Sequence, residues 1–467
     1  MTPAQQTALE KGRAAFAAGR PAEARMKFKK ALKGAPRNVE ILQRLGMAEI
    51  ACDRLDQGLK YLEQGARATR GDASAWQRLA VYLYRAGRME EAREAIEAAL
   101  AANADDVLSL RDFTIYARRD DLNAHPDRLT RLAAIAKAPG RSGEERAIAC
   151  HGLSAAAEAL GEHEAAMRHA LAAGVLRGAA TELAADKARR LVAACEARQT
   201  SPAYPGPVFI VGSPRSGTTL MEQILSRHPE VGACGESLAG REAEAAAIAW
   251  AAREEATPDP YRAAAALPDP ALEVLAAKYL DRTGAARAGK PVWADKSPDN
   301  LSRLPLLARL FPNGRAIVMR RHPLDVAASA ALQLFNDPAF SYTNSLATLA
   351  DHLMGAEVLA DAWAANAPMP VLTVAYETLV RAPEAEIRRI LAFLALDWAP
   401  ECLAPEAADR LVATASAAQV RQGFHAGSIG RWRRYRETLA PLIAALGGEA
   451  AVDAAYARHI APRPDAA

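Results

Sequence analysis

A run of small residues with a single cation lies between two apolar segments. Residues 212–219 read GSPRSGTT, and Arg215 is their only charged residue. Main-chain N–H groups in such a turn can converge on an anion. Apolar residues then recur at helical spacing, so the turn opens into a helix whose N-terminal dipole adds positive potential. The pattern predicts a phosphate cradle, and its candidate binding residues are Ser213, Arg215, Ser216, Gly217, Thr218 and Thr219.

The turn has the glycine spacing of a P-loop but lacks the P-loop lysine. Gly212 and Gly217 are five positions apart, and Thr218 stands where GxxxxGK[ST] places the lysine. In ordinary ATPases and GTPases that lysine and the Mg²⁺ site share this turn. The sequence therefore predicts a nucleotide site that works without a metal. The alternative is a glycine turn that only lets a helix pack on a strand.

Three further candidate residues follow apolar runs that are typical of strands. Glu236 follows VGACG, Lys296 follows VWAD, and Tyr376 follows VLTVA. Ligands of open α/β sheets bind at the carboxyl ends of the strands, where these side chains would lie. Each residue also has a structural interpretation: Glu236 as a helix cap, Lys296 as a solvated charge, and Tyr376 as a half-buried core residue.

Arg321 and Ser329 are candidates for a second phosphate contact. Arg321 follows a predicted strand over residues 316–319, and Ser329 lies eight residues later in a helix that Pro323 is suited to start. Arginine is suited to bidentate phosphate binding. The alternative is a solvated charge and a small packing residue. A later Gly/Ser-rich and basic stretch could fold over a nucleotide, and its candidate residues are Ser416, Ser428 and Arg431.

Composition limits the class of protein. A chain of 467 residues favours two domains, and 51% hydrophobic with 24% charged residues is a globular profile. A net charge of +3 gives no support for general nucleic-acid binding. The five cysteines lack zinc-type spacing, and the chain shows neither an N-terminal signal segment nor an apolar run long enough to span a bilayer. We therefore expect a cytoplasmic protein without structural zinc or a membrane span.

Within the first two hundred residues, a period of 34 runs to about residue 106, is lost, and returns around Gly161 and Ala166. Small and apolar residues 34 or 68 positions apart include Gly12 and Gly46, Ala24 and Ala92, and Phe28, Leu62 and Ile96. Small residues at recurring positions allow helices to approach closely, and the pattern resembles the tetratricopeptide repeat. It predicts four or five antiparallel helix pairs that end near residue 195. Such a solenoid either docks a peptide or protein or packs only against its own catalytic domain.

These patterns predict four segments. Residues 1–196 form the helical repeat domain, and the proline-rich residues 197–206 form a linker. Residues 207–448 form an α/β, P-loop-like domain in which helices flank a central parallel sheet. Residues 449–467 form a C-terminal tail.

The motifs of the second domain resemble those of the sulfotransferase superfamily. They are PRSGTTLMEQILSRHPEV, ARLFPNGRAIVMRRHP with Ser329, YETLV, and SAAQVRQG followed by SIGRW. The tyrosylprotein sulfotransferase branch is the most similar, and the whole chain resembles bacterial sulfotransferases with N-terminal tetratricopeptide repeats. The resemblance covers roughly residues 207–445.

The resemblance implies metal-free transfer of a sulfuryl group from 3′-phosphoadenosine 5′-phosphosulfate to a hydroxyl or amine. The loop would hold the 5′-phosphosulfate, and Arg321 with Ser329 would hold the 3′-phosphate. Glu236 matches the catalytic base and Lys296 a catalytic lysine, although the turn reads DKSP in place of the NKDP type. Tyr376 matches a nucleotide contact, and Ser416 matches a serine three residues before the QV pair. A peptide or protein tyrosine, docked on the repeats, is one candidate acceptor.

Side-chain chemistry is consistent with these roles. A glutamate with an ordinary pKa of about 4.3 is ionised at neutral pH and can accept the acceptor's proton. Arg215, Lys296 and Ser416 can meet the charge that develops on the leaving phosphate oxygen.

Two other functions stay open. A Mg²⁺-dependent, kinase-like P-loop enzyme is disfavoured by Thr218. A catalytically inactive repeat adaptor is disfavoured because Arg215, Glu236, Lys296 and Arg321 are all present.

Overall fold

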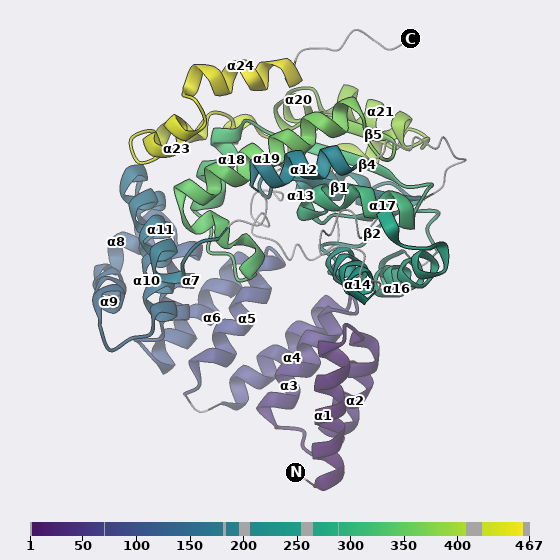
Figure 1. The fold of residues 1–467 in the computed structure, drawn as a ribbon. Coiled ribbons are helices and arrows are strands. Elements are labelled where there is room, and N and C mark those ends of the chain that lie inside the picture. Colours follow the sequence, from purple (N-terminus) through teal and green to yellow (C-terminus); the bar gives the residue numbers. More distant parts are fainter. Residues whose placement is uncertain are drawn as a thin grey trace. The chain divides into compact units, whose positions relative to one another are not determined.

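The chain forms two compact units, one helical and one built on a sheet. The computed structural model describes residues 2–69, 71–180, 184–195, 206–253, 265–287, 289–407 and 423–460. The first unit ends at Arg177, and the second begins at Gly178 (Figure 1). Among the helices of these residues, none combines the length and the apolar character that crossing a membrane requires.

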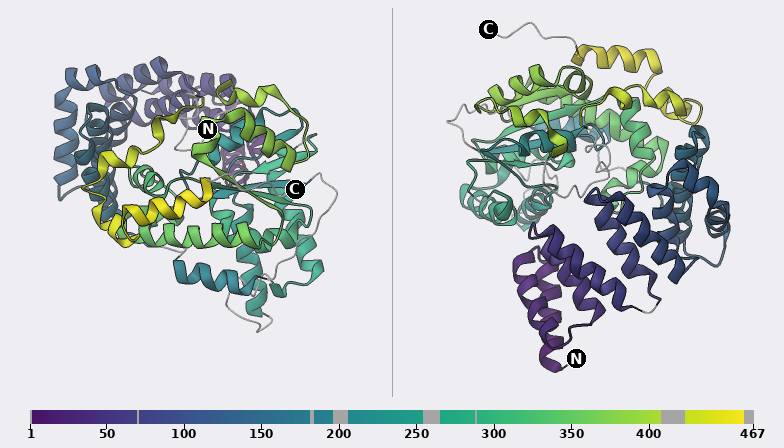
Figure 2. Two further views of the ribbon diagram at one scale, coloured as in Figure 1. Left: turned by 90° about the horizontal axis from the view of Figure 1, so that it is seen from above. Right: turned by 180° about the vertical axis from the view of Figure 1, so that it is seen from behind.

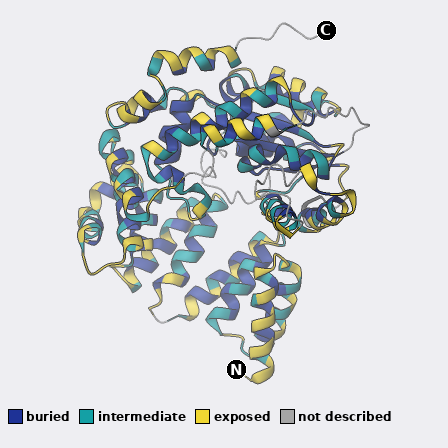
Figure 3. Cartoon of the chain, in the orientation of Figure 1, coloured by how far each residue is buried: buried dark blue, intermediate teal, exposed yellow. Residues whose placement is uncertain are grey.

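The first unit is built from antiparallel helix pairs, as the period of 34 predicts. Each helix carries buried residues, and each except α3 also carries exposed ones (Figure 3). The helices are α1 (Pro3–Ala17), α2 (Pro21–Lys33), α3 (Val39–Ile50), α4 (Leu55–Ala68), α5 (Ala73–Arg85), α6 (Met89–Ala102), α7 (Val107–Tyr116), α8 (Arg119–Ala124), α9 (Pro126–Lys137), α10 (Gly143–Leu160) and α11 (His163–Arg177).

The repeating glycines lie where two helices of a pair meet. A Cβ atom on Gly12 would lie 2.4 Å from Cε1 of Phe28, and one on Gly46 would lie 2.7 Å from Cγ of Leu62. No larger side chain fits there without moving the partner helix. Small residues therefore allow the close helix approach that the sequence predicts.

The repeat also places helix caps that the sequence analysis did not identify. Asn38, Asp72 and Asp106 are 34 residues apart, and each is the N-cap of a first helix. Their side chains accept hydrogen bonds from main-chain N–H groups of the following turn, at 2.9 to 3.0 Å. Such caps contribute roughly 1 kcal/mol each, so the period fixes helix starts as well as packing.

The second unit is built on a five-stranded parallel sheet with the strand order β2-β3-β1-β4-β5. This confirms the predicted α/β class with a central parallel sheet. Val208 of β1 lies beside Ala294 of β3 and Arg315 of β4. The strands are β1 (Pro207–Gly212), β2 (Val231–Ala233), β3 (Val292–Asp295), β4 (Arg315–Arg320) and β5 (Val371–Ala375).

Helices cover both faces of this sheet (Figure 2). Successive residues of β1 point to opposite faces, so Phe209 and Val211 join one core and Val208 and Ile210 the other. The first core includes α12 (Ala185–Ala194), α14 (Ala239–Arg253), α16 (Asp269–Arg287), α17 (Leu304–Leu310) and α19 (Leu346–Ala365). The second includes α13 (Thr218–Ser226), α20 (Tyr376–Arg381) and α21 (Pro383–Phe393).

Two predicted boundaries are wrong. Helix α12 was assigned to the repeats, but Ala188 and Leu191 pack in the core of the second unit. Residues 449–460 are not a tail but helix α24 (Glu449–Ile460), which follows α23 (Ala440–Ala445). Apolar side chains such as Leu191 were available to either neighbour, so periodicity alone could not assign the helix. The predicted linker lies outside the described residues except for residue 206.

Candidate active site

A candidate site residue or loop follows each of the five strands. Glu236 follows β2, Lys296 follows β3, the small-residue loop follows β1, Arg321 follows β4, and Tyr376 follows β5. Because the strands are parallel, their carboxyl ends lie along the same edge of the sheet. The fold thus gathers side chains that are up to 163 residues apart in the sequence.

The loop after β1 depends on two glycines. Gly212 has φ +141° and Gly217 has φ +104°, in a region that L side chains rarely adopt. A Cβ on Gly217 would also lie 2.8 Å from Cδ2 of Tyr376, and one on Gly212 would lie 2.4 Å from the carbonyl oxygen of Met319. The loop therefore lies tightly against the ends of β4 and β5. Arg215, between the glycines, is itself left-handed at φ +73°.

Arg215 and Arg321 meet behind this loop. Arg215 Nε donates to Ser329 Oγ at 2.8 Å. Arg321 Nη1 donates to the carbonyl oxygen of Arg215 at 3.2 Å, and Nη2 donates to that of Ser428 at 2.5 Å. The Arg321 guanidinium also lies 4.6 Å from the centre of the Tyr376 ring. The structure thus brings together the residues predicted for the second phosphate contact.

The electrostatics of this cluster are unfavourable in the absence of an anion. Burial lowers the pKa of Arg215 to about 10, and the positive charges of Arg321 and Arg431 act in the same direction. A cavity of about 240 Å³ beside the cluster is lined by Arg321, Ser329, Ser428 and Arg431, among others. Two arginines and one carboxylate, that of Asp325, line the cavity, so its formal charge is positive, and Ser329 connects it to Arg215 of the loop.

Asp325 positions the segment that carries Ser428 and Arg431. Its carboxylate accepts hydrogen bonds from the main-chain N–H of Gly430 at 2.7 Å and of Trp432 at 3.0 Å. Asp325 lies in α18 (Pro323–Ala331), the helix that also carries Ser329. An acidic residue suits the first turn of this helix, where the helix dipole favours a negative charge. The partners of Asp325 are more than a hundred residues away, so no local signal could have identified them.

Glu377 is a second positioning residue that the sequence analysis missed. Its carboxylate accepts a hydrogen bond from the main-chain N–H of His322 at 3.1 Å and another from Tyr456 Oη. His322 directly follows Arg321, and Tyr456 belongs to α24. Helix α24 therefore supports the end of β4, which explains why residues 449–460 belong to this unit.

Glu236 and Lys296 form an ion pair at the ends of β2 and β3. Lys296 Nζ binds Glu236 Oε1 directly. The Lys296 side chain is fully buried, whereas 47% of the Glu236 side chain is exposed. The buried ammonium group of Lys296 thus holds the carboxylate of Glu236, which stays partly exposed to solvent.

Buried polar groups hold the two turns that carry this pair. Ser297 Oγ donates to Asp295 Oδ1 at 2.6 Å and accepts from the main-chain N–H of Ser237 at 3.1 Å. Tyr279 Oη donates to Asp295 Oδ2 at 2.5 Å. Burial raises the pKa of Asp295 to about 6, with smaller contributions from nearby carboxylates. Ser297 thereby links the end of β3 to the residue that follows Glu236.

The remaining predicted residues divide into three groups. Ser216, Thr218 and Thr219 are buried in the loop and the first turn of α13. Ser213 instead lines a second, larger cavity with Gly212 and Pro214. Ser416 lies outside the described residues.

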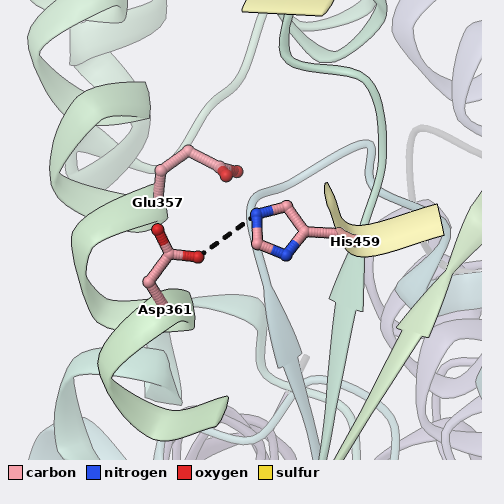
Figure 4. Close-up of side chains that lie close together, drawn as sticks. All are labelled: Glu357, Asp361 and His459. Atoms are coloured by element: carbon pink, nitrogen blue, oxygen red, sulfur yellow. Dashed lines mark ion pairs between the residues drawn. The ribbon is translucent and has the colours of Figure 1, made fainter. Parts of the chain in front are cut away.

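A separate group of possible metal ligands lies between α19 and α24. Ligand atoms of Glu357, Asp361 and His459 lie within 4.8 Å of one another (Figure 4). Both carboxylates bind the Arg320 guanidinium, with 2.7 Å between Arg320 Nη1 and Asp361 Oδ1. The Arg320 side chain is only 1% exposed, so these carboxylates supply its counter-charge.

Comparison with known proteins agrees with this geometry. Residues 207–400 match the model of the sulfotransferase family, and residues 15–80 match that of the tetratricopeptide repeat. An uncharacterized protein of Aquifex aeolicus (strain VF5) is 33% identical over 51% of this chain and 32% of its own length. Protein-tyrosine sulfotransferase 2 of Gallus gallus is 30% identical over 42% of this chain and 53% of its own length. The nodulation protein NoeE of Sinorhizobium fredii (strain NBRC 101917 / NGR234) is 30% identical over 43% and 52%, respectively.

The chain spans about a third of the Aquifex protein and about half of the other two relatives. Among solved structures, the sulfotransferase domain from the Synechococcus PCC 7002 olefin synthase matches 54% of this chain and 99% of its own, at 22% identity. The TM-score of this match is 0.33, which is too low to support a statement about this chain. The family match nevertheless covers all five strands and the candidate residues from Ser213 to Tyr376. The second unit therefore contains a segment, residues 207–400, that matches the sulfotransferase family, and the first unit contains one, residues 15–80, that matches the tetratricopeptide repeat.

Proposed function

We propose that this protein transfers a sulfuryl group from 3′-phosphoadenosine 5′-phosphosulfate to an acceptor hydroxyl or amine. The observation that carries the proposal is the convergence of Arg215, Arg321 and Arg431. Burial lowers the pKa of Arg215 to about 10, and the positive charges of the other two arginines act in the same direction. Charged phosphate groups bound there would offset this repulsion through charge-assisted hydrogen bonds.

The chain offers two phosphate contacts for such a donor. The main-chain N–H groups of the loop and the start of α13 would bind the 5′-phosphosulfate. Ser216 Oγ is available there, because it is buried and has no hydrogen-bond partner within the described part of the chain. Arg321 and Ser329, with the segment of Ser428 and Arg431, would bind the 3′-phosphate. Tyr376, stacked on Arg321, would contact the nucleotide.

The chemistry requires a base and a stabiliser of the leaving group. The bound donor supplies an activated sulfuryl group to which the acceptor oxygen or nitrogen forms a bond as the sulfur–oxygen bond to phosphate breaks. Glu236 accepts the acceptor's proton from its exposed side. Lys296, Arg215 and the predicted Ser416 stabilise the electron pair that departs on the phosphate oxygen. Thr218 in place of the P-loop lysine favours a reaction without a metal.

Acceptor and partners belong to the same proposal. Relatives named protein-tyrosine sulfotransferases make a peptide or protein tyrosine one candidate acceptor. Tetratricopeptide repeats suit the docking of a peptide or protein. The five free cysteines are compatible with the cytoplasmic location expected from the sequence.

Calorimetric titration with adenosine 3′,5′-bisphosphate in the presence of EDTA tests the donor assignment. We expect saturable binding, and at least tenfold weaker binding of adenosine 5′-monophosphate, which lacks the 3′-phosphate that Arg321 would hold. Absence of binding would refute the proposal. ATP turnover that requires Mg²⁺ would favour the kinase-like alternative.

A further inference from the structure

The second unit contains a larger cavity that the small-residue loop helps to line. Its empty space of about 670 Å³ includes space open to solvent, and it is lined by Ser213 and Pro214 of the loop, η1 (Pro298–Arg303), η2 (Pro338–Asn344) and α19. Because the loop would hold the sulfuryl donor, a molecule in this cavity would lie next to the transferred group.

Two buried polar atoms in the wall of this cavity have no hydrogen-bond partner among the described residues. Tyr342 is 4% exposed, and its hydroxyl makes no hydrogen bond with any described residue. His352, whose ring stacks on that of Tyr342 at 3.6 Å, has a buried Nδ1 that also lacks a partner there. Buried polar groups are normally hydrogen-bonded, and an unpaired one costs roughly 1–3 kcal/mol. Their position in the cavity wall indicates that a ligand supplies the missing bonds.

The cavity shows no preference for a charged ligand. Its four charged lining residues are two cations and two carboxylates, so their formal charges cancel. Arg303 donates to Glu244 at 2.9 Å and to Asp299 at 2.8 Å, which pairs three of the four. Burial lowers the pKa of His352 to about 3, so its imidazole is neutral at physiological pH.

The two unpaired groups, on Tyr342 and His352, limit which class of acceptor can satisfy the cavity wall. A phenol has a single hydroxyl, which becomes the nucleophile and leaves Tyr342 and His352 unpaired. A sugar residue presents several neutral hydroxyls, so that one can act as the nucleophile while others bond to the cavity wall. Its apolar face can pack on Phe340, which also lines the cavity.

We propose that this cavity, through Tyr342 Oη and His352 Nδ1, binds a neutral sugar residue as the sulfuryl acceptor. The inference rests on the proposed function and names its acceptor class. A sugar oxygen would bond to sulfur, its proton would pass to Glu236, and the electron pair of the broken sulfur–oxygen bond would remain on the phosphate of the donor.

The test uses the full chain, labelled donor, and maltose, cellobiose and lactose as acceptor probes beside a tyrosine-containing hexapeptide. We expect labelling of at least one disaccharide. In Tyr342→Phe, we expect the KM for that sugar to rise about tenfold, while the affinity for adenosine 3′,5′-bisphosphate stays unchanged. Labelling of the peptide alone, or equal sugar KM values in the two proteins, would overturn the acceptor assignment. A wild-type protein that fails to bind the bisphosphate would instead refute the proposed function, and the acceptor assignment with it.

A stability measurement tests the site without any acceptor. Tyr342→Phe should unfold at the same temperature as the wild type or higher, since the lost hydroxyl has no partner. Tyr279→Phe is the matched control, because its hydroxyl binds the buried Asp295, and it should unfold at a lower temperature. A comparable loss in both variants would show that the Tyr342 hydroxyl is already paired and would overturn the proposal.

Discussion

Arginines that pair with carboxylates in the first unit differ in what they face from Arg215 and Arg321 of the second unit. Arg67 and Arg128 in the repeats bind the carboxylates of Glu63 and Glu97. Arg321 in the second unit donates to main-chain carbonyls and stacks on Tyr376, close enough to Arg215 to lower its pKa. The Arg67–Glu63 pair is exposed, and such pairs are worth roughly 0–1 kcal/mol and leave no free charge for a ligand. Clustered guanidinium groups oppose folding but are ready to bind an anion, which is how Arg215 and Arg321 differ functionally from Arg67.

Glutamates of the two units should differ most in their effect on activity. Glu236→Gln removes the proposed base but keeps the shape of the side chain, so transfer of labelled sulfate should fall about 10²- to 10⁴-fold. Calorimetry should show little change in affinity for adenosine 3′,5′-bisphosphate. Glu63→Gln, which alters an exposed pair in the repeats, is the control and should keep wild-type turnover. Full activity in Glu236→Gln would remove Glu236 from its role.

The second-largest difference is expected between arginines of the two units, in their effect on nucleotide affinity. Arg321→Ala should weaken binding of adenosine 3′,5′-bisphosphate by roughly 10- to 100-fold, because charge-assisted hydrogen bonds are worth about 1.5–3 kcal/mol. Arg67→Ala should leave this affinity unchanged and alter stability by less than about 0.5 kcal/mol, since the Arg67 side chain is 69% exposed. Equal affinities of the two variants by calorimetry would contradict the 3′-phosphate assignment.

The smallest difference is expected between two glycines with left-handed backbone conformation, in their effect on stability and on nucleotide binding. Gly161, the C-cap of α10, has φ +86° and open space around it, so Gly161→Ala should cost roughly 1–2 kcal/mol of conformational strain alone. Gly217→Ala adds a contact with Tyr376, so it should cost more and also weaken bisphosphate binding. Chemical denaturation measures the first difference and calorimetry the second. Unchanged nucleotide binding in Gly217→Ala would show that the loop does not hold the donor.

Much of the fold and of the candidate site was predictable from local sequence patterns. The strand, glycine loop and helix that begin at residue 207 follow one another directly in the sequence. The repeat period is visible in residues such as Gly12 and Gly46, which are 34 positions apart. The unit to which α12 belongs could not be predicted, because the sequence of an amphipathic helix does not show which neighbour covers its apolar face. Asp325 and Glu377 escaped prediction because their partners come from the far end of the chain.

The sequence by itself determined the repeats, the parallel strands and the reactive side chain at each strand end, because these depend on periodicity and on short-range turn chemistry. Only the tertiary structure decided which of those side chains meet. The strand order β2-β3-β1-β4-β5 does not follow the chain, so it alone pairs Glu236 with Lys296 and places Arg321 beside Arg215. It likewise encloses Tyr342 and His352 in a cavity, since burial and the loss of water are properties of packed elements and not of any single segment.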